Sequence, residues 1–173
     1  MLKRFPLVSA LVVIILMLDQ LTKWLVSSHL AVGQSVYPFP GLAPFVAITY
    51  VTNTGVSFGL FQNANALFAG VSIVVSVVVV RYLLSLPKER RLVRLALALV
   101  LAGAVGNLID RLRLGYVVDF VAVSGWPKFN VADGSIVVGV IVLALTMLLE
   151  GRQPPPQADK ILEEHEETRI GSA

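Results

Sequence analysis

Four long apolar stretches constrain the fold of this 173-residue chain more than any other feature. They run from Phe5 to about Val26, from Ala66 to Leu86, from Leu92 to Ile109 and from Val131 to Leu149. A helix of roughly 20 mostly apolar residues is long enough to cross a bilayer. Only helices and closed barrels satisfy their backbone polar groups in lipid. The sequence therefore predicts an all-α membrane protein with four transmembrane helices.

The composition narrows the chemistry that such a protein can perform. Charged residues make up 14% of the chain, whereas a typical soluble domain has roughly 25%. Cysteine is absent and the only histidines are His29 and His165, which excludes disulfides, a thiolate nucleophile and the commonest zinc sites. We therefore expect neither a metal nor another cofactor. The basic excess lies in the apolar part of the chain, which favours membrane orientation over nucleic-acid binding.

The positions of lysine and arginine predict how the helices are oriented. Basic residues precede the first span at Lys3 and Arg4, and others fill the short 87–94 turn, whereas residues 27–64 contain no Lys or Arg. Because cytoplasmic connections are enriched in these residues, both termini and the 87–94 turn are assigned to the cytoplasm. The longer connections, 27–64 and 110–130, then face outward. No small-residue cleavage site follows the first span, so we expect that span to be retained.

The segments outside the spans carry two further signals. Turn residues at Pro38, Pro40, Gly41 and Pro44 punctuate the first outer connection, and the apolar run Phe45–Val51 follows them. This pattern predicts short strands on the membrane surface. Residues 151–173 contain three consecutive prolines and an acidic run, which predicts a disordered cytoplasmic tail. The predicted domains are therefore 1–150, the four-helix transmembrane part, and 151–173, the tail.

Polar residues gather at the predicted outer ends of all four spans. A charge at the centre of a span costs about 2.5–3.5 kcal/mol on insertion scales, and tolerated charges would not favour one leaflet. This clustering therefore indicates a functional site at the outer membrane boundary. Its candidate residues are Asp19, Lys23, Asn53, Asn107, Asp110, Arg111, Asp119, Asn130 and Asp133.

Several of these residues have plausible structural roles. Asp19 and Lys23 are four positions apart, share a helix face and can form an ion pair. Asp110 and Arg111 either form an ion pair at the membrane boundary or leave the arginine to bind a substrate carbonyl or head group. The small residues at positions 102 and 106, and at 135 and 139, predict close contacts between helices.

Asp119 and Asp133 have no basic residue within three positions, and apolar residues flank each of them. A carboxyl group in such surroundings is poorly solvated, and two that meet share one proton. One could take a proton from water while the other donates one to a peptide carbonyl, as in an aspartyl hydrolase. The residues alone leave two alternatives open, a transporter ion site and purely structural boundary polars. A serine–lysine hydrolase, with Ser57 or Ser124 and Lys23 or Lys128, has no supporting spacing.

At these residues the chain resembles lipoprotein signal peptidase, also called signal peptidase II, a family of bacterial inner-membrane aspartyl proteases. Five blocks carry the resemblance in the family's order: Asp19–Lys23, Asn53–Gly59, Gly103–Arg111, Val117–Phe120 and Phe129–Asp133. The departures are modest, because Val56 and Ser57 replace alanines, Ala102 replaces a glycine and Gly134-Ser135 replaces Ser-Ala. No acid or amide is lost, although Ser57 and Ser135 could alter inhibitor affinity.

The resemblance implies an enzyme that removes the signal peptide from a diacylglyceryl-modified prolipoprotein, just before the lipidated cysteine. It implies that Asp119 and Asp133 are the catalytic pair. It further implies that Asn53, Asn107, Arg111 and Asn130 contact substrate, and that Asp19, Lys23 and Asp110 are mainly structural.

The resemblance also implies a fold, an inhibitor class and a location. The fold is four spanning helices with a small β-sheet cradle on the outer membrane surface, consistent with strands in 36–51. The expected partners are prolipoprotein substrates, membrane lipid and globomycin-type peptide inhibitors. The protein itself is expected to be a monomer in the bacterial inner membrane. Gly55 and Gly59 are candidate hinges for a loop that covers the site.

Overall fold

A computed structural model describes residues 6–43, 45–55 and 64–150 of the chain. The chain divides into two compact units, residues 1–143 and 144–173. Within the second unit, the described part is the end of a helix that begins in the first. All the sites considered below lie in the first unit.

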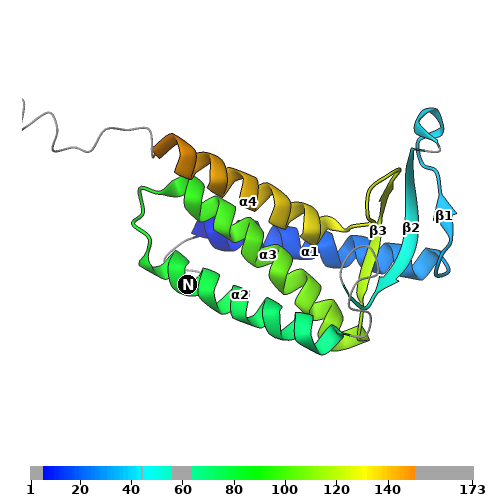
Figure 1. The fold of residues 1–173 in the computed structure, drawn as a ribbon, viewed down its shortest axis with the longest axis horizontal. Helices are drawn as coiled ribbons and strands as arrows, with labels where there is room; N and C mark the ends of the chain where they lie inside the picture. Colours follow the sequence, from blue (N-terminus) through cyan, green and yellow to red (C-terminus); the bar gives the residue numbers. More distant parts are fainter. Residues whose placement is uncertain (1–5, 44, 56–63, 151–173) are drawn as a thin grey trace, which may run out of the picture. The chain divides into compact units, whose positions relative to one another are not determined.

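Four helices correspond to the predicted spans: α1 (Pro6–His29), α2 (Asn65–Ser85), α3 (Arg91–Leu114) and α4 (Val131–Glu150), shown in Figure 1. Helix α2 ends one residue before the predicted end at Leu86. Each is long and apolar enough to cross a membrane, which confirms the predicted multi-pass architecture. Two predicted ends were too early, because α1 continues beyond Val26 and α3 continues beyond Ile109. Asp110 and Arg111 therefore lie inside α3. This helix ends where Gly115 adopts the left-handed conformation, with φ 82°, which glycine reaches without steric cost.

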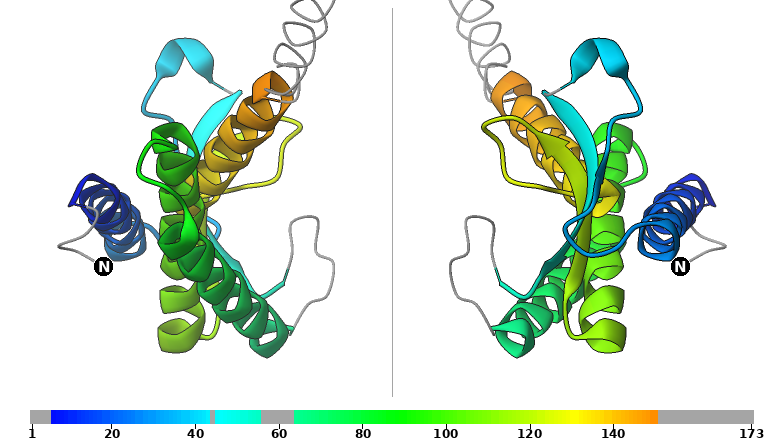
Figure 2. Two further views of the ribbon diagram at one scale, coloured as in Figure 1. Left: turned by 90° about the vertical axis from the view of Figure 1, so that its left-hand side faces the viewer. Right: turned by 90° about the vertical axis from the view of Figure 1, so that its right-hand side faces the viewer.

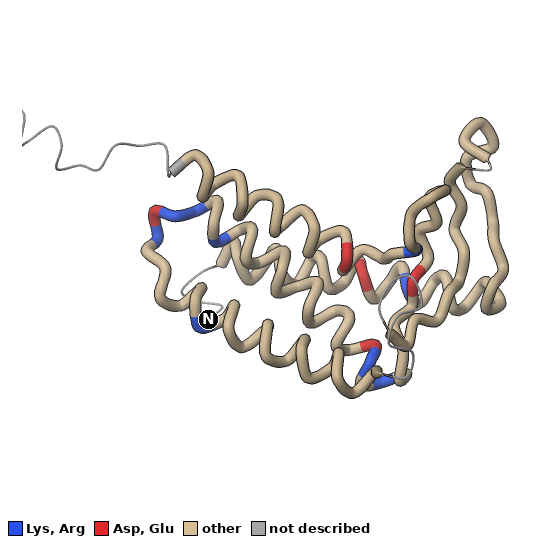
Figure 3. Tube along the Cα trace, viewed as in Figure 1, with Lys and Arg blue, Asp and Glu red and all other residues tan. Residues whose placement is uncertain are grey.

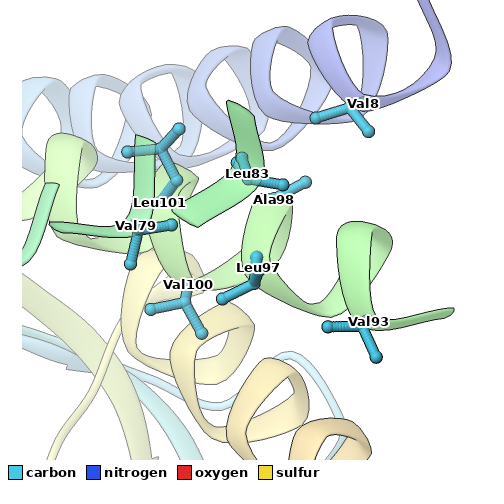
Figure 4. Close-up of a cluster of buried hydrophobic side chains, with 8 residues drawn as sticks. All are labelled: Val8, Val79, Leu83, Val93, Leu97, Ala98, Val100 and Leu101. Atoms are coloured by element: carbon cyan, nitrogen blue, oxygen red, sulfur yellow. The ribbon is translucent and has the colours of Figure 1, made fainter. Parts of the chain in front are cut away.

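Helix α3 is the central helix of the first unit. In the apolar 18-residue stretch of α3, 67% of the residues are buried, whereas the share is 17% in the corresponding stretch of each of the other three helices. Figure 2 shows α3 between α1 and α2, and both pack against it. The contacting apolar side chains form a core cluster from these three helices, drawn in Figure 4: Val8, Val79, Leu83, Val93, Leu97, Ala98, Val100 and Leu101.

Small residues bring α3 close to α1 and α4. A Cβ atom on Gly103 would collide with the backbone oxygen of Ala132 in α4, and one on Gly106 would lie 2.8 Å from a carboxylate oxygen of Asp19. A Cβ on Gly139 would lie 2.7 Å from the backbone oxygen of Ala96. The close contacts predicted at Gly106 and Gly139 are confirmed, and Gly103 adds one that was not predicted. Together they allow polar groups of α1, α3 and α4 to meet.

A three-stranded antiparallel sheet of order β1-β2-β3 lies beside one end of the helices (Figure 1). Its strands are β1 (Ser35–Val36), β2 (Val46–Asn53) and β3 (Val117–Val123). A short 3-10 helix, Pro40–Leu42, connects the first two strands. The strands predicted in the first outer connection are present. Strand β3 was not predicted, because residues 110–130 were interpreted only as a connection. Its β-branched sequence lies between two positive-φ glycines, Gly115 and Gly125, which is an ordinary strand signal.

Three sequence predictions fall on residues outside the described ones. Ser57 and the proposed hinge Gly59 belong to the segment 56–63, and the predicted tail occupies 151–173. The division into domains 1–150 and 151–173 stays a prediction.

Candidate active site

Strand β3 places Asp119 where the sheet meets the helices. The strand pairs with β2 so that Asp119 lies opposite Val51, and Val117 lies opposite Asn53. The Asp119 side chain is 2% exposed. Its two carboxyl oxygens accept hydrogen bonds from the side-chain amides of Asn53, at 2.9 Å, and Asn130, at 2.8 Å. Two amides from different elements therefore fix its orientation.

Asp133 lies in the first turn of α4, where its position follows from how that helix begins. The Asn130 side-chain oxygen accepts a bond from the Asp133 backbone N–H at 2.9 Å, and the Asp133 carboxylate accepts one from the Asn130 backbone N–H at 3.2 Å. This reciprocal arrangement is a capping box, which satisfies backbone donors that a helix start leaves unpaired. The spacing Asn130-x-x-Asp133 thus begins the helix and holds the carboxylate in place.

Asn130 also connects this helix start to the strand. The residue is 1% exposed. Its side-chain Nδ2 lies within hydrogen-bond distance of the Asp119 carboxylate, of the Asn107 side-chain oxygen at 3.1 Å and of the Val118 backbone oxygen at 3.3 Å. A single asparagine thereby sets the positions of Asp119 and Asp133 relative to each other. We call these two acids the cavity carboxylates.

The environment of Asp119 favours its protonated form. Burial raises its pKa from the ordinary value of 3.8 to about 7, and the negative charge of Asp133 contributes in the same direction. The hydrogen bonds from Asn53 and Asn130, and the positive charge of Lys23, oppose that rise without cancelling it. A carboxyl group with a pKa about 7 can hold a proton at neutral pH and still release it.

A second set of buried ionisable groups lies beside the first. We call Asp19, Lys23 and Asp110 the lysine cluster. The ammonium nitrogen of Lys23 lies 2.8 Å from an Asp19 oxygen and 2.9 Å from an Asp110 oxygen. It also donates to the side-chain oxygen of Asn107 at 3.0 Å. All three ammonium hydrogens thus have an acceptor, and all three members of the cluster are buried.

The lysine cluster joins four elements of the fold. Asp19 on α1 accepts a bond from the Ala132 backbone N–H in α4 at 2.9 Å. Asp110 on α3 accepts one from the Val118 backbone N–H in β3 at 3.1 Å, and another from the Gln20 side chain at 3.0 Å. The predicted Asp19–Lys23 ion pair is confirmed. Asp110 pairs with Lys23 across two helices, which decides against the predicted alternative in which its partner is Arg111.

Asn107 is the residue that contacts both sets of groups. Its side-chain oxygen accepts bonds from Lys23 and Asn130, and its Nδ2 donates to Asp133 at 2.7 Å. With its oxygen held by two donors, the amide can present only its NH₂ group to Asp133. The lysine cluster therefore fixes the direction in which Asn107 contacts a cavity carboxylate.

The cavity carboxylates face a cavity of about 180 Å³. Its other lining residues are Asn53, Gly55, Phe68, Asn107, Arg111 and Val117. The guanidinium of Arg111 lies over the Phe68 ring, 5.7 Å from its centroid, in a cation–π arrangement. This holds the arginine at the cavity wall, and the half-buried side chain is free of the lysine cluster. The cavity offers two acids, two amides and one cation to a polar group of a ligand.

The structure brings most predicted site residues to this cavity. Asp119, Asp133, Asn53, Asn107 and Arg111 line it, while Asn130 lies behind the two acids. The three residues predicted to be structural form the separate lysine cluster. Among the residues that the structure describes, no group of three or more metal-ligating side chains could hold an ion.

Two contributors were missed by sequence reasoning. Phe68 lies on the first turns of α2, and nothing in the local sequence links it to Arg111. Gln20, next to Asp19, donates to both acids of the lysine cluster. The signal for the capping box, an asparagine three positions before an aspartate at a helix start, was present in the sequence.

Comparison with known proteins identifies the family. The sequence profile described as Signal peptidase (SPase) II matches residues 11–149, which is most of the chain. The chain belongs to the signal peptidase II family. By that membership it is a peptidase, and the matched region contains the sheet, both cavity carboxylates and all or most of each helix.

Individual relatives agree with the family assignment. The lipoprotein signal peptidase of Moorella thermoacetica is 44% identical over 148 residues, which cover 83% of this chain and 97% of the relative. That of Acinetobacter baumannii is 39% identical over 155 residues, covering 85% and 86%. Two solved structures of bacterial membrane enzymes superpose with TM-scores of 0.80 and 0.74, at 27% and 29% identity. They cover 86% and 82% of this chain, and each alignment covers 92% of the solved chain.

Proposed function

We propose that this chain is an intramembrane aspartyl endopeptidase that removes the signal peptide from diacylglyceryl-modified prolipoproteins. The bond cut is the one just before the lipidated cysteine. The observation that carries this proposal is the placement of Asp119 and Asp133 on one cavity wall, with Asn130 bonded to both. The relatives named lipoprotein signal peptidase support the substrate class.

The electrostatics support a division of labour between the cavity carboxylates. Two neighbouring carboxyl groups resist simultaneous ionisation, so the pair holds one proton. We assign this proton to Asp119, because burial raises its pKa to about 7 and its carboxyl group can therefore both hold and release a proton near neutral pH. Asp133 is then the carboxylate that acts as general base.

The reaction follows from these protonation states. Asp133 takes a proton from a water molecule while the water oxygen attacks the carbonyl carbon of the scissile peptide. Asp119 donates its proton to the carbonyl oxygen, giving a neutral tetrahedral intermediate. Collapse of that intermediate breaks the C–N bond, returns a hydroxyl proton to Asp119 and delivers the proton on Asp133 to the leaving amine of the cysteine. Each carboxyl group ends in its starting state.

The polar cavity walls support binding of an extended peptide. Asn53, Asn107 and Arg111 present hydrogen-bond donors beside the cavity carboxylates. Asn53 and Asn107 already hold the acids, so Arg111 is the donor best placed to bind a substrate carbonyl or head group. Globomycin-type peptides would compete for the same donors, on an enzyme that acts as a monomer.

The location of the site also fits a lipid-anchored substrate. The cavity lies at one end of α3, and the cation-rich turn between α2 and α3 lies at the other. Positive-inside orientation assigns that turn and both termini to the cytoplasm, so the cavity faces the outer leaflet of the bacterial inner membrane. A signal helix whose cysteine lipid rests in that leaflet brings the scissile bond to the same depth.

The test is cleavage by purified full-length protein in detergent. The substrate is a diacylglyceryl-modified prolipoprotein, and Asp119→Asn and Asp133→Asn are the test variants. We expect wild type to cut before the lipidated cysteine, and each variant to bind the substrate without cutting it. An unlipidated prolipoprotein serves as the matched control and should stay intact.

Each other outcome has a definite reading. Full cleavage by either variant would refute the two-aspartate mechanism. Wild-type binding without cleavage would indicate a non-catalytic member of the family. Ion flux into liposomes that persists in Asp119→Asn would favour the transporter alternative.

A further inference from the structure

A second cavity, of about 300 Å³, lies at the opposite end of α3 from the cavity carboxylates. Leu7 and Val8 from the start of α1, and Leu95 from α3, form its apolar wall. The helix rises 1.5 Å per residue, so its deepest cation, Arg94, lies roughly 24 Å along the helix axis from Asp110. This cavity is therefore separate from the proposed catalytic site and lies at the other membrane boundary.

The rest of the lining consists of Pro6 and three cations: Lys88, Arg91 and Arg94. Arg91 and Arg94 are three positions apart, so they share one helix face. None of the described residues that line this cavity is acidic. Figure 3 shows the basic residues of the α2–α3 turn gathered at this end of the helices, with Glu89 the single acid among them. The cavity therefore combines one sign of charge with an apolar wall.

Membrane orientation alone does not account for this arrangement. The positive-inside rule requires basic residues in the turn but sets no requirement on where their side chains lie. Arg90 satisfies it without lining the cavity, whereas Arg94 is 6% exposed and contributes to the cavity wall. Lys88 and Arg91, which are exposed, add two further cations to the same cavity, so an anionic ligand could reach them from solvent or lipid.

We propose that this cavity binds the phosphate head group of an anionic phospholipid from the cytoplasmic leaflet. Lys88, Arg91 and Arg94 contact the phosphate, and the first carbons of the acyl chains lie along Leu7, Val8 and Leu95. Basic pockets between helices at the cytoplasmic boundary suit such head groups. The charge complementarity and the adjacent apolar wall favour a lipid over a free anion, which would use only the cations. The proposal depends on the helices crossing a membrane and is independent of the proposed cleavage reaction.

The experiment measures lipid binding to the delipidated full-length protein in detergent by native mass spectrometry. The probes are phosphatidylglycerol and phosphatidylethanolamine with identical acyl chains, each titrated with and without inorganic phosphate. The test variant is Lys88→Gln with Arg91→Gln, because both side chains are exposed and their replacement should leave folding intact. Arg90→Gln is the matched control, since it removes a charge from the same turn without touching the cavity lining. Thermal unfolding of all three proteins checks the fold.

We expect phosphatidylglycerol to bind more tightly than phosphatidylethanolamine. The double variant should weaken phosphatidylglycerol binding by roughly tenfold or more, while Arg90→Gln changes it by less than about threefold. Equal losses in the two variants would overturn the proposal in favour of diffuse attraction to the basic turn. Equal binding of the two lipids would also overturn the proposal, because it would show that the apolar wall binds acyl chains without any contribution from the cations. Displacement of the lipid by millimolar phosphate would identify a site for a free anion.

Discussion

The lysine cluster and the cavity carboxylates each contain two acids, and these two neighbouring pairs have opposite electrostatic environments. In the lysine cluster, one ammonium lies between Asp19 and Asp110 and donates to both. Around Asp119 and Asp133 the donors are asparagine amides and one backbone N–H. Within the described residues, no ion pair joins either cavity carboxylate to a cation. The ammonium of Lys23 compensates the charges of Asp19 and Asp110. Asp119 and Asp133 have no such ion-paired cation, and in the proposed mechanism they share one proton instead.

The comparison predicts that isosteric substitutions in the two pairs have opposite consequences. Asp133→Asn removes the proposed general base, so the cleavage rate should fall by roughly 10³-fold or more, with little change in the melting temperature. Asp110→Asn removes half of the negative charge around Lys23, so the melting temperature should fall while the rate changes by less than about tenfold. Initial rates and thermal unfolding in the same detergent measure both effects. Similar rate losses in the two variants would show that the lysine cluster takes part in the chemistry.

Removing the cation should affect folding more than removing either of its acids. Lys23→Met leaves Asp19 and Asp110 buried together without a counter-ion, which should cost about 3–5 kcal/mol of the free energy of unfolding. The matched control is the triple variant Lys23→Met, Asp19→Asn, Asp110→Asn, in which no buried charge is left uncompensated. It should recover much of the lost stability in chemical unfolding. If Lys23→Met unfolds like wild type, the cluster does not stabilise the fold.

Much of this contrast could be predicted from the sequence. Asp19 and Lys23 are close in sequence, and their spacing predicted the ion pair directly. The four spans and the gathering of polar residues at one depth follow from hydropathy and orientation, because lipid penalises unpaired charge. The absence of basic neighbours around Asp119 and Asp133 correctly indicated that these two acids differ from the others.

The remainder depends on tertiary contacts that local patterns do not contain. Asp110 is adjacent to Arg111 in sequence, yet it pairs with Lys23 because Gly106 lets α1 approach α3. The pairing of β3 with β2 brings Asn53 to Asp119 from 66 positions away. The contact between Phe68 and Arg111 likewise depends on how α2 packs. Sequence reasoning singled out the two acids that the structure places at one cavity, and it left most of their hydrogen-bond partners to be found in the fold.

The pH dependence of stability should reveal the raised pKa of Asp119. Asp119 is more easily protonated in the folded protein than in the unfolded chain, because burial raises its pKa from 3.8 to about 7. Its contribution to stability is therefore complete below pH 3.8 and is lost as pH rises through about 7. The loss amounts to at most about 4 kcal/mol. We expect wild type to lose stability between about pH 4 and pH 7, relative to Asp119→Asn.

The measurement is thermal unfolding of both proteins at each pH, with Asp110→Asn as the control. That variant leaves Asp119 unchanged, so its stability should fall between about pH 4 and pH 7 as that of wild type does. Parallel curves for wild type and Asp119→Asn would contradict the raised pKa. They would also remove the reason for assigning the shared proton to Asp119.

The smallest predicted effect separates the two roles of Asn130, which caps α4 and also donates to Asp119. Asn130→Ser keeps an oxygen that can accept the Asp133 backbone N–H, while Asn130→Ala removes it, so the alanine variant should be less stable by about 1 kcal/mol. Both variants lose the side-chain amide donor to Asp119. Because an ordinary hydrogen bond contributes about 0.5–1.5 kcal/mol, both should cleave roughly 2- to 10-fold more slowly. Wild-type activity in Asn130→Ser would mean that the helix cap alone positions the acids, since the serine hydroxyl is too short to reach Asp119 as the amide does.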